Sequence, residues 1–421
     1  MRPAPECGVR HAPTLRPRAV RAVRLRGKPI IDAVTEVDLE DPRRAPAGPA
    51  RAAGALRRAA PALLAYAGVR ALGLLLLAVW SAVRGKSPHT LLTGRWDSLW
   101  YTRVADFGYG WEVRLPDGTV HSNLAFFPLL PWLERLVSAV SPLSYADAGL
   151  VVSWLASLCA AWGIFRVAEL LYGRRAGVCA VALWAVLPVG IVQSMAYSES
   201  LFTALAAWSL YAVLTGRWVS AGLLASLAGL TRPVGAAVVA AVWATAAVRV
   251  ARERRISWRT AVGVLLAPAG AAAYVLWVGH RTGGGLFGYL DVQGQWGNGF
   301  DGGLAFARFV GEKLTSFPSA LAGLGLIAGV ALVIWLYVLC VRRRQPLALL
   351  VYCGIVVALA LCASGYFGSK PRLLLPAFPL LLPIAVALAR LRTSRAAAVL
   401  GGVAVASAVY GAVWLNGSGP P

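Results

Sequence analysis

Residues 319–341 read SALAGLGLIAGVALVIWLYVLCV, and none of them is charged. A helix of this length crosses the roughly 30 Å of hydrocarbon in a bilayer. Three arginines, Arg342, Arg343 and Arg344, follow the run directly. An apolar run that ends in a group of arginines is typical of a membrane-spanning helix whose arginine end faces the cytoplasm. This stretch therefore predicts a helix in lipid.

Similar runs recur through most of the chain. Of its 421 residues, 58% are hydrophobic and only 14% are charged, and the mean hydropathy is +0.65. This composition excludes an ordinary soluble domain. We predict an all-α, polytopic transmembrane protein with about eleven spanning helices. The predicted helices cover residues 61–83, 146–171, 176–196, 199–215, 217–231, 233–249, 260–279, 319–341, 346–364, 371–390 and 396–415.

The basic residues predict the orientation of these helices. The net charge is +23, but the basic side chains form short clusters between apolar runs, which indicates membrane topology rather than a surface for nucleic acid. Residues 1–57 are rich in Pro, Arg and Ala and predict a disordered cytoplasmic tail. The transmembrane domain is then 58–421, and every second connection carries arginine. Two long connections, about 84–145 and 280–318, face the outside.

The first of these connections contains the best candidate for chemistry. It includes GRWDSLWY at residues 94–101, which places Asp97 among aromatic side chains at the boundary of lipid and water. A carboxylate there can act as a base toward a lipid-anchored substrate. The alternative is an ion pair between Asp97 and Arg95, worth at most about 1 kcal/mol if exposed. Farther along, residues 124–140 are apolar but broken by prolines, and they predict a segment lying on the membrane.

Five motifs in a fixed order connect the chain to a known family. They are RWDSLWY at 95–101, ADFGY at 105–109, FFPLLP at 126–131, YSES at 197–200 and LTRP at 230–233. Together they resemble the PIG-V-like mannosyltransferases, which are membrane enzymes of the GT-C glycosyltransferase class. The resemblance extends from about residue 72 to residue 389. It implies a GT-C-like fold with a large first extracytoplasmic loop.

The resemblance also implies a reaction. PIG-V-like enzymes transfer mannose, with inversion, from a polyprenyl-phosphate-mannose donor to an acceptor outside the membrane, and here the acceptor would be a lipid, glycan or protein. GT-C enzymes resembling this chain carry an essential acid in the first outer loop, and the motif maps that acid to Asp97, the candidate general base. A transporter or flippase of a lipid-linked sugar is the alternative function. Transporters usually contain repeats with broken helices, and the sequence shows no convincing repeat.

The leaving phosphate develops negative charge, so the site also needs cations or hydrogen-bond donors. The candidates near the outer surface are Arg95, His121, Arg232, Lys370 and Arg372. Arg232 lies between two apolar runs, where an unpaired arginine would cost about 2.5–3.5 kcal/mol on insertion scales. Lys370 and Arg372 could instead be interfacial anchors.

Three further polar residues are candidates for substrate contact. Asp106 could be a second acid, or it could cap the turn at Gly108. Glu199 begins an apolar helix, where the helix dipole alone would stabilise a carboxylate. Asn123, like His121, could bind sugar hydroxyls or phosphate.

The sequence contains no cluster of His, Cys and Asp with the spacing of metal ligands. We therefore expect no metal and no cofactor beyond the lipid-linked sugar, which is itself a substrate. The expected partners are membrane lipid and the polyprenyl-phosphate sugar donor, and no nucleic acid. The expected location is the cell membrane, with a cytoplasmic N-terminus and an extracytoplasmic active site.

Overall fold

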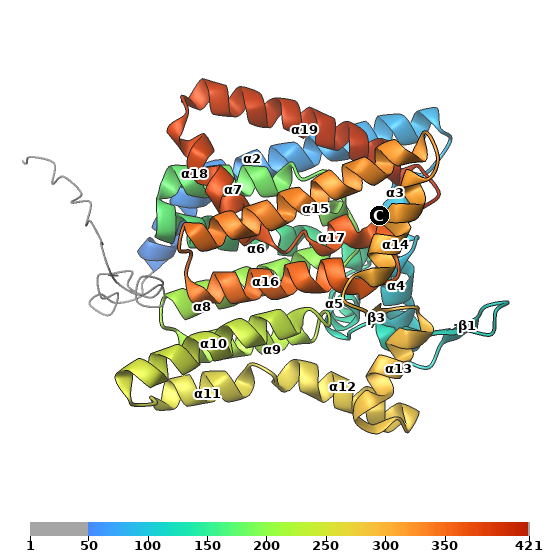
Figure 1. The fold of residues 1–421 in the computed structure, drawn as a ribbon, viewed down its shortest axis with the longest axis horizontal. Coiled ribbons are helices and arrows are strands. Elements are labelled where there is room, and N and C mark those ends of the chain that lie inside the picture. Colours follow the sequence, from blue (N-terminus) through green and yellow to red (C-terminus); the bar gives the residue numbers. More distant parts are fainter. Residues whose placement is uncertain (1–48, 420–421) are drawn as a thin grey trace, which may run out of the picture.

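The computed structural model describes residues 49–419 and is a bundle of roughly parallel and antiparallel helices (Figure 1). Within these residues, six helices are long and apolar enough to cross a membrane, or seven if the bent pair Phe367–Leu373 and Phe378–Arg390 counts as one span. The protein is thus all-α and polytopic. The predicted count of about eleven spanning helices is not confirmed within these residues, where three further apolar helices, Glu199–Leu214, Trp218–Gly229 and Leu347–Cys362, are shorter than the others. Most of the predicted tail, residues 1–48, lies outside the described residues.

Helix α2 (Pro49–Val83) begins earlier than the predicted residue 61. The segment before Pro61 is rich in Arg and Ala, which are among the strongest helix formers. The helix therefore continues beyond the apolar run. Residues 49–57, which the sequence analysis assigned to the tail, belong to α2.

Three of the predicted helices are interrupted at prolines, which lack the N–H group needed inside a helix. The predicted helix 176–196 stops at the end of α7 (Arg174–Ala185), before Pro188, and a 3-10 turn, η3 (Gly190–Ser194), follows. The predicted helix 260–279 divides at Pro268 into α11 (Trp258–Leu266) and α12 (Ala269–Thr282). The predicted helix 371–390 divides near Pro376, with a bend of 71°. Its parts are α17 (Lys370–Leu373), η6 (Phe378–Leu381) and α18 (Leu382–Arg390).

The other predicted helices are continuous, with ends that shift by a few residues. They are α6 (Tyr145–Tyr172), α8 (Glu199–Leu214), α9 (Trp218–Gly229), α10 (Gly235–Glu253), α15 (Ser319–Arg342), α16 (Leu347–Cys362) and α19 (Thr393–Leu415). Helix α6 packs against α7 and α8, and α19 runs beside α2.

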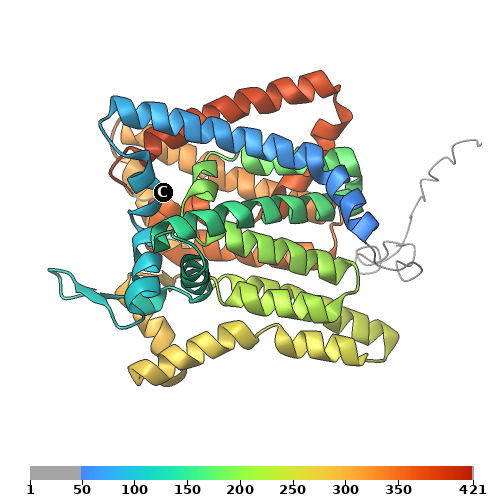
Figure 2. The ribbon, with the colours of Figure 1, turned by 180° about the vertical axis from the view of Figure 1, so that it is seen from behind.

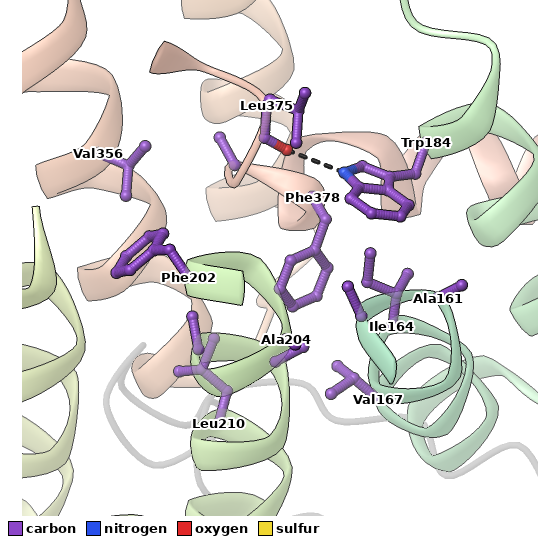
Figure 3. Close-up of a cluster of buried hydrophobic side chains, with 14 of the residues drawn as sticks. Ala161, Ile164, Val167, Trp184, Phe202, Ala204, Leu210, Val356, Leu375 and Phe378 are labelled. Carbon is purple, nitrogen blue, oxygen red and sulfur yellow. Dashed lines mark hydrogen bonds between the residues drawn. The ribbon is translucent and has the colours of Figure 1, made fainter. Parts of the chain in front are cut away.

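The core lies where α6, α7 and α8 meet the bent segment after α17. Figure 3 shows Phe378 between Phe202 on one side and Trp184 and Ile164 on the other, and all four side chains are fully or almost fully buried. The indole of Trp184 donates a hydrogen bond of 3.0 Å to the carbonyl of Leu375. This bond ties α7 to the bend, so the core holds the chain just after Arg372 in place.

Small residues allow other helices to approach closely. Gly222 of α9 lies so near Gly263 of α11 that a methyl group on Gly222 would collide with the Gly263 carbonyl. Contacts of this kind are common between helices in membranes, where lipid supplies no hydrophobic driving force and close packing replaces it.

The two long connections gather at the same end of the bundle (Figures 1 and 2). The first contains α3 (Pro88–Thr93), α4 (Asp97–Phe107), a hairpin of β1 (Glu112–Arg114) and β2 (Val120–Ser122), η2 (Asn123–Ala125) and α5 (Leu129–Ala139). The second contains η4 (Gly285–Phe287), α13 (Gly288–Gln295), β3 (Gly299–Phe300) and α14 (Leu304–Leu314). Strand β3 pairs with β4 (Ala363–Ser364), just before η5 (Phe367–Ser369) and α17.

Helix α5 lies across the long helices, and Figure 2 views it almost end-on. Its exposed side chains include Trp132 and Leu136, whereas Glu134 is fully buried. The Glu134 carboxyl faces Gly149 of α6, and burial raises its pKa well above the ordinary value. The carboxyl is thus buried against α6, and the apolar side chains of α5 lie on its outer face. That this segment lies on the membrane stays a prediction.

Candidate active site

Two carboxylates and two arginines meet at the end of the bundle that carries the connections. Asp97 begins α4 and Glu199 begins α8. Arg232 lies between α9 and α10, and Arg372 lies in α17. Each comes from a different part of the sequence. The fold therefore assembles this cluster, which we call the charged cluster.

Arg372 connects the two carboxylates. Its Nη2 lies 2.8 Å from Oδ2 of Asp97, and its Nε lies 3.7 Å from Oε1 of Glu199. Arg232 forms a second ion pair with the same oxygen of Glu199. Glu199 thus holds both arginines, whereas Asp97 contacts only Arg372 among the ion pairs of the described chain.

Local structure explains how these side chains reach the cluster. Non-helical residues come just before both carboxylates, so each is the first residue of a helix. The helix dipole favours negative charge at this position. Trp96, directly before Asp97, has a φ of 52°, which is rare for an aromatic residue. Arg232 precedes Pro233, and a residue before proline is disfavoured in a helix. The arginine therefore lies in a break between two apolar helices.

The cluster is mostly shielded from solvent. The side chain of Glu199 is 1% exposed, whereas that of Asp97 is 22% exposed. Asp97 is therefore the more accessible of the two carboxylates. The Nε and Nη1 atoms of Arg372 are buried without a hydrogen-bond partner in the part of the chain that the structure describes. Both carboxylate oxygens of Glu199 are buried in the same way, so ion pairs rather than hydrogen bonds connect Glu199 to the two arginines.

Tyrosine and serine side chains surround the cluster. The hydroxyls of Tyr101 and Ser198 lie 2.7 Å apart, and Arg232 donates to Ser198 over 3.4 Å. The guanidinium of Arg372 lies over the ring of Tyr197, 5.1 Å from its centre. Burial raises the pKa of Tyr101, so its hydroxyl stays protonated. Tyr101, Tyr197 and Ser198 were not among the predicted site residues, although they lie inside the RWDSLWY and YSES motifs.

Arg95 and Lys370 point away from the charged cluster. Arg95 does not pair with Asp97, whose partner is Arg372. Its Nη1 instead donates to the carbonyl of Leu415, 3.3 Å away. The Nζ of Lys370 donates to the carbonyl of Ala360, 2.8 Å away. The structure thus brings only two of the predicted cations, Arg232 and Arg372, to the carboxylates.

The other predicted residues of the first connection also lie outside the cluster. Asn123 is buried, accepts from the Gly110 amide and donates to the Gly108 carbonyl, so it closes the loop after α4. His121 stacks on Trp296 at 4.2 Å. Asp106 is exposed in the last turn of α4. The turn at Gly108 is closed by a backbone hydrogen bond from its amide to the carbonyl of residue 104.

An aromatic group joins the two connections beside the cluster. Trp100 lies one helical turn after Asp97 on α4, and its ring packs 4.5 Å from Trp111 and 4.7 Å from Trp296. Phe126 stacks on Trp100 at 5.5 Å. This group fixes α4 relative to α13, and no periodicity in the sequence indicates these pairings.

Comparisons with known proteins found solved structures only, since no protein-family model and no curated protein matches the sequence. ArnT from Cupriavidus metallidurans bound to undecaprenyl phosphate is 15% identical, with a TM-score of 0.48 over 77% of this chain and 61% of ArnT. The archaeal oligosaccharyltransferase AglB from Archaeoglobus fulgidus, in complex with an inhibitory peptide and a dolichol-phosphate, is 12% identical. Its TM-score is 0.43, over 85% of this chain and 56% of AglB. The chain thus spans little more than half the length of these proteins.

The charged cluster has the chemistry of an anion site next to a base. Two arginines supply planar guanidinium groups, which suit phosphate geometry, and the accessible carboxylate of Asp97 can accept a proton. Residues 54–419 contain no group of three or more His, Cys, Asp or Glu side chains that could hold a metal ion.

Proposed function

We propose that this protein is a GT-C-class membrane glycosyltransferase that takes a sugar from a polyprenyl-phosphate donor. The convergence of Asp97, Glu199, Arg232 and Arg372 carries this proposal, because a general base and two cations lie within one cluster. The PIG-V-like order of the motifs supports mannose as the sugar.

In this reaction, Asp97 accepts the proton of the acceptor hydroxyl as its oxygen attacks the anomeric carbon. The bond between that carbon and the phosphate oxygen breaks, and the polyprenyl phosphate leaves with the electron pair. Attack from the face opposite the leaving group inverts the anomeric configuration. One carboxylate suffices, because a lipid phosphate is already a competent leaving group. A positioned base contributes about 10²- to 10⁴-fold to such a step.

Arg372 connects donor binding to this base. Without substrate, its Nη2 is bound to Asp97, while its Nε and Nη1 have no hydrogen-bond partner within residues 49–419. A donor phosphate that binds these groups competes with Asp97 for the guanidinium. The carboxylate is then free to accept a proton. Arg232 stabilises the charge of the departing phosphate, and Glu199 orients both arginines.

Replacing Arg372 with leucine is expected to weaken the binding of polyprenyl phosphate about 10- to 100-fold. The loss of charge-assisted hydrogen bonds costs about 1.5–3 kcal/mol, and each 1.4 kcal/mol is tenfold in affinity. The measurement is equilibrium binding of polyprenyl phosphate to the protein in nanodiscs. Arg114→Leu, which removes an exposed arginine from β1, serves as the matched control. Equal affinities for the two variants would contradict a phosphate role for Arg372.

The activity itself is tested in proteoliposomes with radiolabelled polyprenyl-phosphate mannose and a membrane extract as the source of acceptor. The proposal expects label in a product other than the donor. If the labelled donor only moves between leaflets and remains intact, the protein is a flippase.

We also propose that the connections at the site end face the outside of the cell membrane. Single cysteines at Asp117 and Arg254, in a cysteine-free background, test this orientation with a membrane-impermeant maleimide on intact cells. Both residues are exposed. Asp117 belongs to the β1–β2 hairpin and Arg254 to the connection between α10 and α11, and these two segments lie at opposite ends of the bundle (Figure 1). Asp117→Cys should be labelled and Arg254→Cys should not. The reverse labelling would place the site in the cytoplasm.

A further inference from the structure

Basic side chains next to the charged cluster bind the ends of helices. The last four carbonyls of an α-helix lack partners within the helix, and they carry the negative end of the helix dipole. Two such ends, those of α16 and α19, lie near the cluster. Lys370 binds the first of them, and Lys86 and Arg95 bind the second.

Lys370 closes the end of α16. Its Nζ lies 2.8 Å from the carbonyl of Ala360 and 2.7 Å from that of Ala363, and its side chain is buried. Lys370 is also the first residue of α17, two residues before Arg372. The bonds of Lys370 therefore fix the backbone from which Arg372 reaches Asp97.

Arg95 and Lys86 bind the end of α19. Arg95 donates to the carbonyls of Leu415 and Gly417, each 3.3 Å away, through Nη1 and Nη2. Lys86 donates to the carbonyl of Asn416 over 2.6 Å. The side-chain amide of Asn416 in turn donates to Ser81 of α2 over 3.1 Å. The end of α19 is thus tied to the chain on both sides of α3.

Arg95 lies two residues before Asp97. Between them, Trp96 has a φ of 52°, and its ring lies 3.9 Å from the Arg95 guanidinium. A positive φ at a residue other than glycine costs about 1–3 kcal/mol and persists only where the surrounding structure holds it. The contacts of Arg95 hold Trp96, and Trp96 sets the direction in which α4 begins at Asp97.

We propose that Arg95 and Lys370 are positioning residues for the Asp97–Arg372 pair, and that neither binds the donor phosphate. Each lies two residues before one member of the pair and binds the end of another helix. Together they fix the starts of α4 and α17, so that Oδ2 of Asp97 and Nη2 of Arg372 lie 2.8 Å apart. This inference rests on the proposed function for its catalytic consequence, but the anchoring is a property of the unliganded protein.

The kinetic test compares Arg95→Leu, Arg95→Lys and Lys370→Met with Arg114→Leu. A misplacement of about 1 Å can cost about 10²-fold in rate. We therefore expect kcat to fall about 10- to 100-fold in Arg95→Leu and Lys370→Met, with part of the rate restored in Arg95→Lys. The affinity for polyprenyl phosphate should change less than about twofold, or about 0.4 kcal/mol. A loss of affinity as large as that of Arg372→Leu would overturn the inference, because it would make these residues phosphate ligands.

Hydrogen–deuterium exchange gives a readout that needs no activity. Arg95→Leu should speed exchange in the first turns of α4, residues 97–101, and leave the β1–β2 hairpin unchanged as an internal control. Unchanged exchange in α4 would overturn the anchoring of Asp97 even if transfer is lost. Absence of transfer in the natural protein would instead count against the proposed function, and exchange would still test the anchor.

Discussion

Replacing Asp97 with asparagine is expected to lower sugar transfer about 10²- to 10⁴-fold, the usual contribution of a positioned base. Asparagine keeps the shape of the side chain, but it cannot take the acceptor proton. The measurement is transfer of label from polyprenyl-phosphate mannose in membranes that contain equal amounts of each protein.

Asp97→Asn should also bind polyprenyl phosphate at least as tightly as the natural protein does. The asparagine is neutral, so it competes less for Arg372, which lies 2.8 Å from the Asp97 carboxylate. Asp117→Asn is the control, since Asp117 is a fully exposed carboxylate of the same connection whose main contacts are with Thr119. Undiminished transfer by Asp97→Asn would remove this residue from the mechanism.

Replacing Glu199 with glutamine is expected to lower the free energy of unfolding by about 3–5 kcal/mol. Removing one partner of a buried ion pair leaves an uncompensated buried charge. Here the uncompensated charge is that of Arg232, because Arg372 loses its contact with Glu199 but keeps its ion pair with Asp97. Thermal unfolding in detergent and the amount of protein in membranes measure the effect.

The matched control is Glu253→Gln. Glu253 pairs with Arg249 at 3.0 Å, but its side chain is 52% exposed, and exposed pairs contribute about 0–1 kcal/mol. The double variant Glu199→Gln with Arg232→Met should recover part of the lost stability, because one unpaired charge is removed. Equal losses in Glu199→Gln and Glu253→Gln would contradict a central role for Glu199 in the cluster.

The predicted helices correspond to helices in the structure because lipid leaves the backbone no other partners. Within hydrocarbon, every N–H and C=O group must bond inside the protein, and a helix satisfies them locally. The breaks were harder to predict. Pro188 and Pro376 are visible in the sequence, but whether a proline kinks or ends a helix depends on what satisfies the freed carbonyls. After α7, Arg70 of α2 binds the carbonyls of Ala185 and Gly190.

The sequence by itself determined that the chain is a membrane protein and roughly which residues form its helices. It also marked Asp97 and Arg232 as charged residues in apolar surroundings. Hydropathy is a local property, so a single run of residues reveals it. Only the tertiary structure decided which basic side chain binds which negatively charged or carbonyl partner. Arg372 binds Asp97, whereas Lys370, two residues away, binds the end of α16. A guanidinium or ammonium group is attracted both to a carboxylate and to the unpaired carbonyls of a helix end. The packing of distant helices determines which of them lies within reach.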